Sequence, residues 1–164
     1  MEKGVRINEQ SSIDALSQRG YGTAEEDALT LAFYEALYLA DKQVLEVKDK
    51  KGKLASFQDL LRAYEAVDEN AWGHYMVYRD LRSRGYVVRE GFGAAIDFRI
   101  YERGAFGKDS AQFLVVSIQE GKPMAMEELA NAMLQCQSLK KELILAVMNR
   151  RGEVVYYSVS PLRF

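Results

Sequence analysis

The sequence predicts an α/β protein of the α+β type, in which a small mixed α/β N-terminal domain precedes a domain with a mixed β-sheet flanked by helices. The chain has 164 residues, enough for one compact domain or two small ones. Apolar residues make up 48% and charged residues 28%, which allows an ordinary hydrophobic core. The spacing of apolar residues changes from helical to strand-like after Gly85. Helices before and between strands indicate a mixed sheet covered by helices.

The N-terminal part is expected to begin with a helix. Residues 1–22 are polar and mixed. Thr23 and Glu26 have the spacing of a capping box, which predicts a helix from there to about Asp41. Apolar residues recur on one face of this helix at Leu29, Ala32, Phe33, Ala36, Leu37 and Ala40.

A short strand and a second helix are expected next. Val44, Leu45 and Val47 predict the strand, and the lysine-rich run 48–53 predicts a solvated turn rather than a phosphate-binding patch. Ser56 is placed to cap the second helix. The apolar residues of that helix are Leu60, Leu61 and Tyr64.

The change of domain is expected at Asp68-Glu69-Asn70, which divides the chain into residues 1–69 and 70–164. Asn70 is the expected N-cap of a helix over Ala71–Arg84, and Gly85 is placed to end that helix.

The rest of the chain predicts five strands and one further helix. Gln112–Ile118 is so apolar that both of its faces are expected to be buried. Met126–Leu139 has the pattern of an amphipathic helix, and turns are expected at Gly91–Gly93 and Asn149–Gly152. The predicted strands are Tyr86–Glu90, Ile96–Tyr101, Gln112–Ile118, Leu143–Met148 and Val154–Val159.

Composition excludes several classes of function. No apolar run approaches the roughly 18 residues that span a bilayer, and the N-terminus lacks the apolar stretch of a secretory signal. Cys136 is the one cysteine, so no intramolecular disulfide is expected, and the location is expected to be cytoplasmic. No residues have metal-ligand spacing and no glycine-rich phosphate loop follows a strand, so neither metal nor cofactor is expected. The net charge of −2 means that nucleic-acid binding would need a local basic patch or a partner.

Several segments, spread over nearly the whole chain, are informative through their order and spacing, although each alone is weak. In the N-terminal part they are Gly20–Gly22, Leu31–Leu39 and Leu45–Val47, and in the C-terminal part Tyr75–Arg89, Asp97–Gly104, Phe113–Val115 and Ser138–Val147. Together these segments resemble the archaeal tRNA-splicing endonuclease family.

The resemblance implies an RNA substrate and a metal-independent cut. The family cleaves precursor tRNA at a bulge–helix–bulge, where a ribose 2′-OH attacks the neighbouring phosphate and leaves a 2′,3′-cyclic phosphate and a 5′-OH. A tyrosine takes the 2′ proton, a histidine protonates the departing oxygen, and a lysine offsets the charge that develops on the phosphate.

Two of these three residue types are present at the family's positions. Tyr101 stands where the tyrosine ends its strand, and Lys141 stands at the lysine, with Lys140 as the alternative register. The histidine position is occupied by Ser110, or by Asp109 if the alignment slips by one residue. A serine hydroxyl is a very weak acid, and an ordinary aspartate is ionised at pH 7 because its pKa is about 3.9. Losing a general acid typically costs roughly 10²–10⁴ in rate, so Tyr101, Ser110 and Lys141 are expected to be vestigial.

Other positions either support the same interpretation or have an ordinary structural explanation. The arginine that the family commonly has seven residues before the lysine is Leu134 here. The only histidine, His74, does not match the family position and is expected to be structural or merely exposed. Tyr101 also fits a strand-end residue packed on the core, and Lys141 a solvated strand-edge lysine. Cys136 is expected to contribute to helix packing, as are Met124, Met126 and Met133.

The apolar C-terminal segment Glu153–Phe164 indicates assembly, because such an end would be an aggregation risk if left open. The resemblance implies a dimer interface there, in an assembly of four units, and Glu120 is a candidate for the family's acidic interface loop. The expected function is therefore a structural subunit that pairs with a catalytic subunit, as a heterotetramer that binds precursor tRNA. An active endonuclease with a divergent acid, and a non-enzymatic protein that reuses the fold, remain alternatives.

Overall fold

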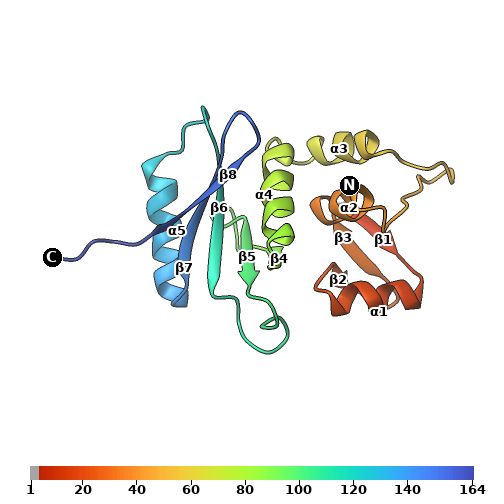
Figure 1. The fold of residues 1–164 in the computed structure, drawn as a ribbon, viewed down its shortest axis with the longest axis horizontal. Helices are drawn as coiled ribbons and strands as arrows, with labels where there is room; N and C mark the ends of the chain where they lie inside the picture. Colours follow the sequence, from red (N-terminus) through yellow and green to blue (C-terminus); the bar gives the residue numbers. More distant parts are fainter. Residues whose placement is uncertain (1–3) are drawn as a thin grey trace. The chain divides into compact units, whose positions relative to one another are not determined.

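The computed structural model describes residues 4–164 of the chain. It divides into two compact units, the first reaching Arg79 and the second running from Asp80 to Phe164. Figure 1 shows the elements of both units in chain order. Residues 1–3 belong to the N-terminal stretch in which no secretory signal is expected, and they lie outside the described residues.

The first unit combines a small antiparallel sheet with helices. Its strand order is β1-β3-β2, with β3 paired to both neighbours. The strands are β1 (Gly4–Ile7), β2 (Thr23–Ala24) and β3 (Leu29–Ala32), and the helices are α1 (Gln10–Gln18), α2 (Phe33–Asp41), α3 (Phe57–Glu65) and the first part of α4 (Ala71–Ser83). The core that joins sheet and helices contains Leu16, Tyr21, Leu29, Leu31, Ala36 and Leu39.

The predicted helix from Thr23 to Asp41 is wrong in its first half. The segment 23–32 contains β2 and β3, and helix α2 begins only at Phe33. The cause is the buried Glu35, whose carboxylate accepts the backbone N–H of Ala32 at 2.8 Å and that of Gly22 at 3.0 Å. This residue closes the start of the helix in the way that Thr23 and Glu26 were expected to do.

The predicted strand over Val44–Val47 is also wrong. Val44 is 54% exposed, and the only pairing recorded near this segment, within residues 4–164, is an isolated bridge between Lys48 and Leu54. The lysine-rich turn is confirmed, because the Asp49 carboxylate accepts the backbone N–H groups of Lys51 and Lys53.

The predicted cap at Ser56 is confirmed. The Ser56 hydroxyl accepts the Asp59 backbone N–H at 3.1 Å, and the Asp59 carboxylate accepts the Ser56 backbone N–H at 2.9 Å. Helix α4 also begins where predicted, and the carbonyl of Asn70 accepts the backbone N–H of His74. The helix ends at Ser83, one residue before the expected end, and Gly85 follows it with a φ of 95°.

The second unit contains the predicted mixed sheet. Its strands lie in sequence order, with β6 and β7 parallel and the other neighbours antiparallel. They are β4 (Val87–Glu90), β5 (Phe98–Tyr101), β6 (Phe113–Gln119), β7 (Glu142–Met148) and β8 (Val154–Val159). Helix α5 (Met126–Leu139) makes the crossover between the two parallel strands (Figure 1).

Helix α5 packs on one face of this sheet. The core there contains Ile96, Leu114, Val116, Ala132, Cys136 and Leu143. On edge strand β8, Val155 is 49% and Tyr157 54% exposed, and the tail continues to the fully exposed Phe164. The exposed apolar edge agrees with the composition of this segment, while its use as an interface stays a prediction. Among residues 4–164, no helix is both long and apolar enough to cross a membrane.

Candidate functional site

The three sequence-predicted positions lie at one end of the second sheet. Ile100 pairs with Phe113, and Phe113 pairs with Glu142, so these residues form a row across β5, β6 and β7. Tyr101 and Lys141 each adjoin a member of this row, and Ser110 precedes Phe113 by three residues. The order of strands thus gathers positions that are up to forty residues apart in sequence.

Ser110 and Lys141 are in direct contact. The Lys141 ammonium donates a hydrogen bond to the Ser110 hydroxyl oxygen, with Nζ and Oγ 2.7 Å apart. The backbone N–H groups of Lys141 and Glu142 donate to the carbonyls of Cys136 and Gln112, which fixes the start of β7. The lysine at this position therefore reaches the position that the resemblance gives to the histidine.

Lys140, the alternative register, has a different role. It is the exposed C-cap of α5 and has a left-handed backbone, with φ 55° and ψ 44°. A left-handed residue here turns the chain sharply from the helix into β7. The structure brings Lys141 to Ser110, and Lys140 makes the turn that directs it there.

The loop from Glu102 to Ser110 is a series of tight turns. The Ala105 carbonyl accepts the backbone N–H groups of both Lys108 and Asp109, and Gly104 and Gly107 each have a φ of 81°. The carboxylate of Asp109 is exposed, and Ser110 is the residue that meets Lys141.

Tyr101 ends β5 and is half-buried. Its ring packs edge-to-face against Phe106 of the loop, with the ring centroids 5.2 Å apart. This contact supports the packing role for Tyr101, and it also fixes the phenol at the end of the sheet.

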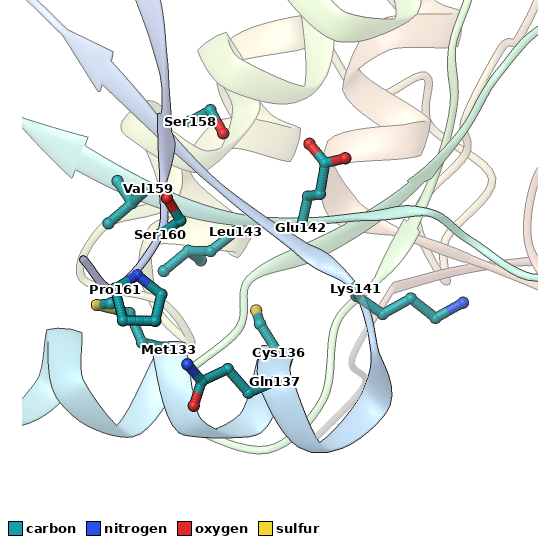
Figure 2. A pocket seen from close by; sticks show the side chains of 10 residues that line it. All are labelled: Met133, Cys136, Gln137, Lys141, Glu142, Leu143, Ser158, Val159, Ser160 and Pro161. Carbon is teal, nitrogen blue, oxygen red and sulfur yellow. The ribbon is translucent and has the colours of Figure 1, made fainter. Parts of the chain in front are cut away.

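A pocket of about 410 Å³ adjoins this end of the sheet (Figure 2). It is lined by the last turns of α5, the start of β7 and the segment after β8, including Cys136, Gln137 and Pro161. In Figure 2 the Lys141 side chain extends away from the other lining residues. Burial raises the pKa of the Cys136 thiol, which makes it a poor nucleophile at neutral pH. Lys141 also lines this pocket while its ammonium is hydrogen-bonded to Ser110, so the pocket adjoins the Ser110–Lys141 contact.

The single histidine belongs to the first unit. Its Nδ1 lies within hydrogen-bond distance of the Asp68 carboxylate, and both side chains are largely buried. Burial resists ionisation of Asp68, but the hydrogen bonds from His74 and from the Asn70 backbone lower the pKa of Asp68 below its usual value. His74 thus has a structural partner near the start of α4.

Two further positions singled out by the sequence are Leu134, at the expected place of an RNA-gripping arginine, and Glu120, the candidate for the acidic interface loop. Leu134 is 63% exposed on α5. The Glu120 carboxylate accepts the backbone N–H of Arg150 at 3.0 Å, which ties the loop after β6 to the turn before β8. Among residues 4–164, no three His, Cys, Asp or Glu side chains group as metal ligands.

Fold and site together define a two-unit α+β protein with a tyrosine, a serine and a lysine at one end of its second sheet. Residues 71–156 match the family model for the tRNA intron endonuclease catalytic C-terminal domain, and residues 2–61 match the model for its N-terminal domain. The chain belongs to the tRNA intron endonuclease family.

Curated relatives agree with this assignment. The chain is 35% identical to the tRNA-splicing endonuclease of Methanococcus vannielii over 99% of this chain and 92% of that protein. It is 31% identical to that of Thermococcus kodakarensis, over 98% of this chain and 94% of the relative. The tRNA-splicing endonuclease of Methanosarcina mazei is 31% identical over 96% of this chain, which covers 44% of that longer protein.

Sequence reasoning missed two arginines and a phenylalanine near Tyr101. Arg89 and Arg99 are directly paired across β4 and β5, and Phe106 packs against Tyr101. Arg99 stands two residues before Tyr101, a spacing that places both on one face of a strand. The spacing of Arg99 and Tyr101 could therefore have been found in the sequence. The place of Arg89 opposite Arg99 could not, because it depends on the register between β4 and β5.

Proposed function

We propose that this chain is the structural, non-catalytic subunit of a tRNA-splicing endonuclease that removes introns from precursor tRNA at bulge–helix–bulge motifs. One observation carries the proposal. The Lys141 ammonium is hydrogen-bonded to the hydroxyl of Ser110, at the position where the resemblance expects an imidazole.

The chemistry of the cut explains why this substitution matters. Attack of a 2′-OH on the adjacent phosphate needs a base for the 2′ proton and an acid for the departing 5′ oxygen. Tyr101 and Lys141 have the residue types for a base and for charge compensation. A hydroxyl bound to a lysine ammonium is no substitute for an imidazolium, whose pKa lies near neutrality. The site would therefore lack the step that releases the 5′-OH end.

The cut would be made by the complete active site of a partner subunit in the cytoplasm, and not by the site of this chain. In the proposal, a catalytic subunit that carries tyrosine, histidine and lysine pairs with this chain in a heterotetramer. The exposed apolar edge at β8 and the tail to Phe164 support such pairing, because apolar surface of this kind is typical of interfaces. No metal or cofactor takes part in the proposed reaction.

A second candidate is an active endonuclease with a divergent acid. The observation that favours it is the exposed carboxyl of Asp109, next to Ser110 in the loop. This candidate requires Asp109, in place of a histidine, to protonate the departing 5′ oxygen.

The deciding experiment is cleavage of a bulge–helix–bulge precursor tRNA in EDTA. Three reactions are compared. They contain the full chain alone, the homologue from the same genome that carries the histidine alone, and the two proteins mixed. Cutting that requires the mixture supports the proposal. Cutting by this chain alone, abolished by Tyr101→Phe or Lys141→Ala, would establish the active endonuclease instead. If this chain neither cuts nor enhances cutting, it is a non-enzymatic protein that reuses the fold.

A further inference from the structure

We propose that the exposed face of α5 binds the α5 of a second copy of this chain, with the two helices antiparallel. This inference goes beyond the proposed function, because it concerns contact between two copies and requires neither RNA nor a catalytic subunit. Three features of α5 support it: an exposed apolar ridge, an exposed side chain and a pocket at opposite ends of that ridge, and opposite charges at the same two ends.

The apolar ridge consists of three residues on the solvent side of α5. Met126 is 76% and Leu134 63% exposed, and Ala130, midway between them, is exposed as well. Residues four apart lie one above the other on a helix, so these three form a continuous line. Ala132 and Cys136, on the opposite side of α5, are buried in the core against the sheet. The ridge is therefore a second apolar face, in addition to the face that packs on the sheet.

The geometry of the ridge suits contact with another helix. Ridges of residues spaced by four fit into the grooves of a similar helix, which is the commonest way in which helices pack in globular proteins. The small side chain of Ala130 lets the second backbone approach closely at the middle of the ridge. Because α5 has 14 residues and is about 21 Å long, two such ridges make a small interface, typical of weak association.

The two ends of the ridge complement each other. Met126 is the first residue of α5. The pocket of about 410 Å³ lies at the other end of the helix, where apolar side chains line it, among them Met133, Leu143, Val159 and Pro161 (Figure 2). In an antiparallel pair, Met126 of each copy lies beside the pocket of the other copy. A methionine side chain is flexible and fills irregular apolar gaps, so it is well suited to such a pocket.

Charge also favours an antiparallel second copy. Glu127 and Glu128 are exposed in the first turn of α5, and Lys140 is exposed directly after its last turn. With two copies antiparallel, the acidic end of each helix lies beside the basic end of the other, whereas a parallel pair would bring like charges together. A contact between identical surfaces must be self-complementary under two-fold symmetry. The face of α5 meets this requirement in shape and in charge.

The test is the association of the purified full chain with itself. Sedimentation velocity between about 1 and 100 μM measures the dissociation constant, and a dimer is expected to form within that range. Leu134→Glu places a charge on the ridge and Met126→Ala shortens the side chain at the pocket, so each is expected to weaken association on the order of tenfold. Leu139→Glu is the matched control. Leu139 is 43% exposed on the same helix but lies about 140° around it from Leu134, so this variant should associate like the wild type.

Charge reversal tests both the partner and its direction. A chain with Glu127→Lys and Glu128→Lys is basic at both ends of α5, and a chain with Lys140→Glu is acidic at both ends. Each is expected to self-associate roughly threefold to tenfold more weakly than the wild type, with the difference shrinking as salt is added. When the two variants are mixed, opposite charges meet at both ends of an antiparallel pair. The mixture should therefore form heterodimers with an affinity near that of the wild type.

Further measurements separate this face from folding and from other surfaces. All the substituted side chains are exposed, so the thermal midpoints should stay close to that of the wild type. Val155→Glu changes the apolar edge at β8 and should leave association between copies unchanged.

Three outcomes would overturn the inference. They are a wild-type chain that stays monomeric up to about 100 μM, a dimer that Leu134→Glu and Met126→Ala leave unchanged, and binding of the histidine-bearing homologue to this face in place of a second copy. None of these measurements uses RNA, so failure of the proposed function in the cleavage experiment does not affect them.

Discussion

The pairs Asp68–His74 and Ser110–Lys141 differ in burial and in what they connect. The first is largely buried and joins the segment before α4 to the helix itself. The second is exposed and joins the loop after β5 to the start of β7. The only imidazole of the chain is therefore in a pair that supports a helix, while the exposed pair contains the serine that the proposed function places at the position of the general acid.

Because of this difference in burial, changes to the Asp68–His74 pair are expected to affect stability, and changes to the Ser110–Lys141 pair are expected to affect function. Buried polar groups must be hydrogen-bonded, so breaking the Asp68–His74 pair costs stability. An exposed pair contributes about 0–1 kcal/mol, so Ser110 and Lys141 can be changed with little effect on folding. The two pairs can consequently be tested by different measurements, and a result on one does not depend on the other.

The largest effect is expected from Ser110→His. If Tyr101 and Lys141 retain a competent arrangement, an imidazole beside them would restore the general acid and raise cutting by this chain by roughly 10²–10⁴. Cutting should then fall as pH rises above about 6.5, because the acid must be protonated. The measurement is cleavage of precursor tRNA in EDTA between pH 5 and 9. Ser110→Ala is the control and should remain inactive. An inactive, folded Ser110→His variant would show that more than the acid has been lost.

Substitutions in the Asp68–His74 pair are expected to lower the stability of the protein. Asp68→Ala removes the acceptor of both His74 and the Asn70 backbone N–H, and should lower the free energy of unfolding by about 2 kcal/mol. Asp68→Asn should cost less, since an amide oxygen still accepts one hydrogen bond. Urea denaturation at pH 7 measures both.

The pH dependence of the free energy of unfolding provides a further test of the Asp68–His74 pairing. The pKa of Asp68 is lowered in the folded protein, so its contribution is fully present above its usual value near 3.8 and is lost as pH falls below that value. The difference between wild type and Asp68→Ala should therefore shrink below about pH 4. A constant difference down to pH 2 would contradict the assigned pairing.

A third polar contact, within the second unit, provides a comparison with the exposed pair. The Tyr156 hydroxyl donates to the Asp80 carboxylate at 2.6 Å, and Arg84 donates to the same oxygen at 2.7 Å. Tyr156→Phe should cost about 1.5 kcal/mol, measured by urea denaturation. Burial and the hydrogen bond to Asp80 raise the pKa of Tyr156, so this contribution is present below pH 10 and lost as pH rises above it. Equal stability of the variant and wild type at pH 7 would contradict this expectation.

The smallest effect concerns the turn that positions Lys141. Lys140 has a left-handed backbone, which costs a residue with a Cβ about 1–2 kcal/mol relative to glycine. Lys140→Gly is expected to raise the free energy of unfolding by about 1 kcal/mol. Lys122→Gly, in an exposed turn, is a control for the loss of a lysine charge. A destabilised Lys140→Gly variant would indicate that its side chain has a role of its own.

Helices and strands were predicted correctly from the sequence where the local pattern of residues agrees with the tertiary surroundings. Helix Met126–Leu139 and strand Val154–Val159 were predicted with their observed ends. The helix expected from Thr23 failed because a capping-box spacing is local, whereas the residue that closes the start of α2 is Glu35, through an N–H thirteen residues away. The strand at Val44 failed because no described neighbour pairs along it.

The sequence by itself determined the family, the mixed sheet and the residue types at Tyr101, Ser110 and Lys141, because these follow from order, spacing and alternation along the chain. Tertiary structure alone decided which lysine meets Ser110, that His74 is held by Asp68, and that Arg89 faces Arg99. Each of these depends on strand register or on a contact between distant segments, and single-sequence periodicity contains no information on either.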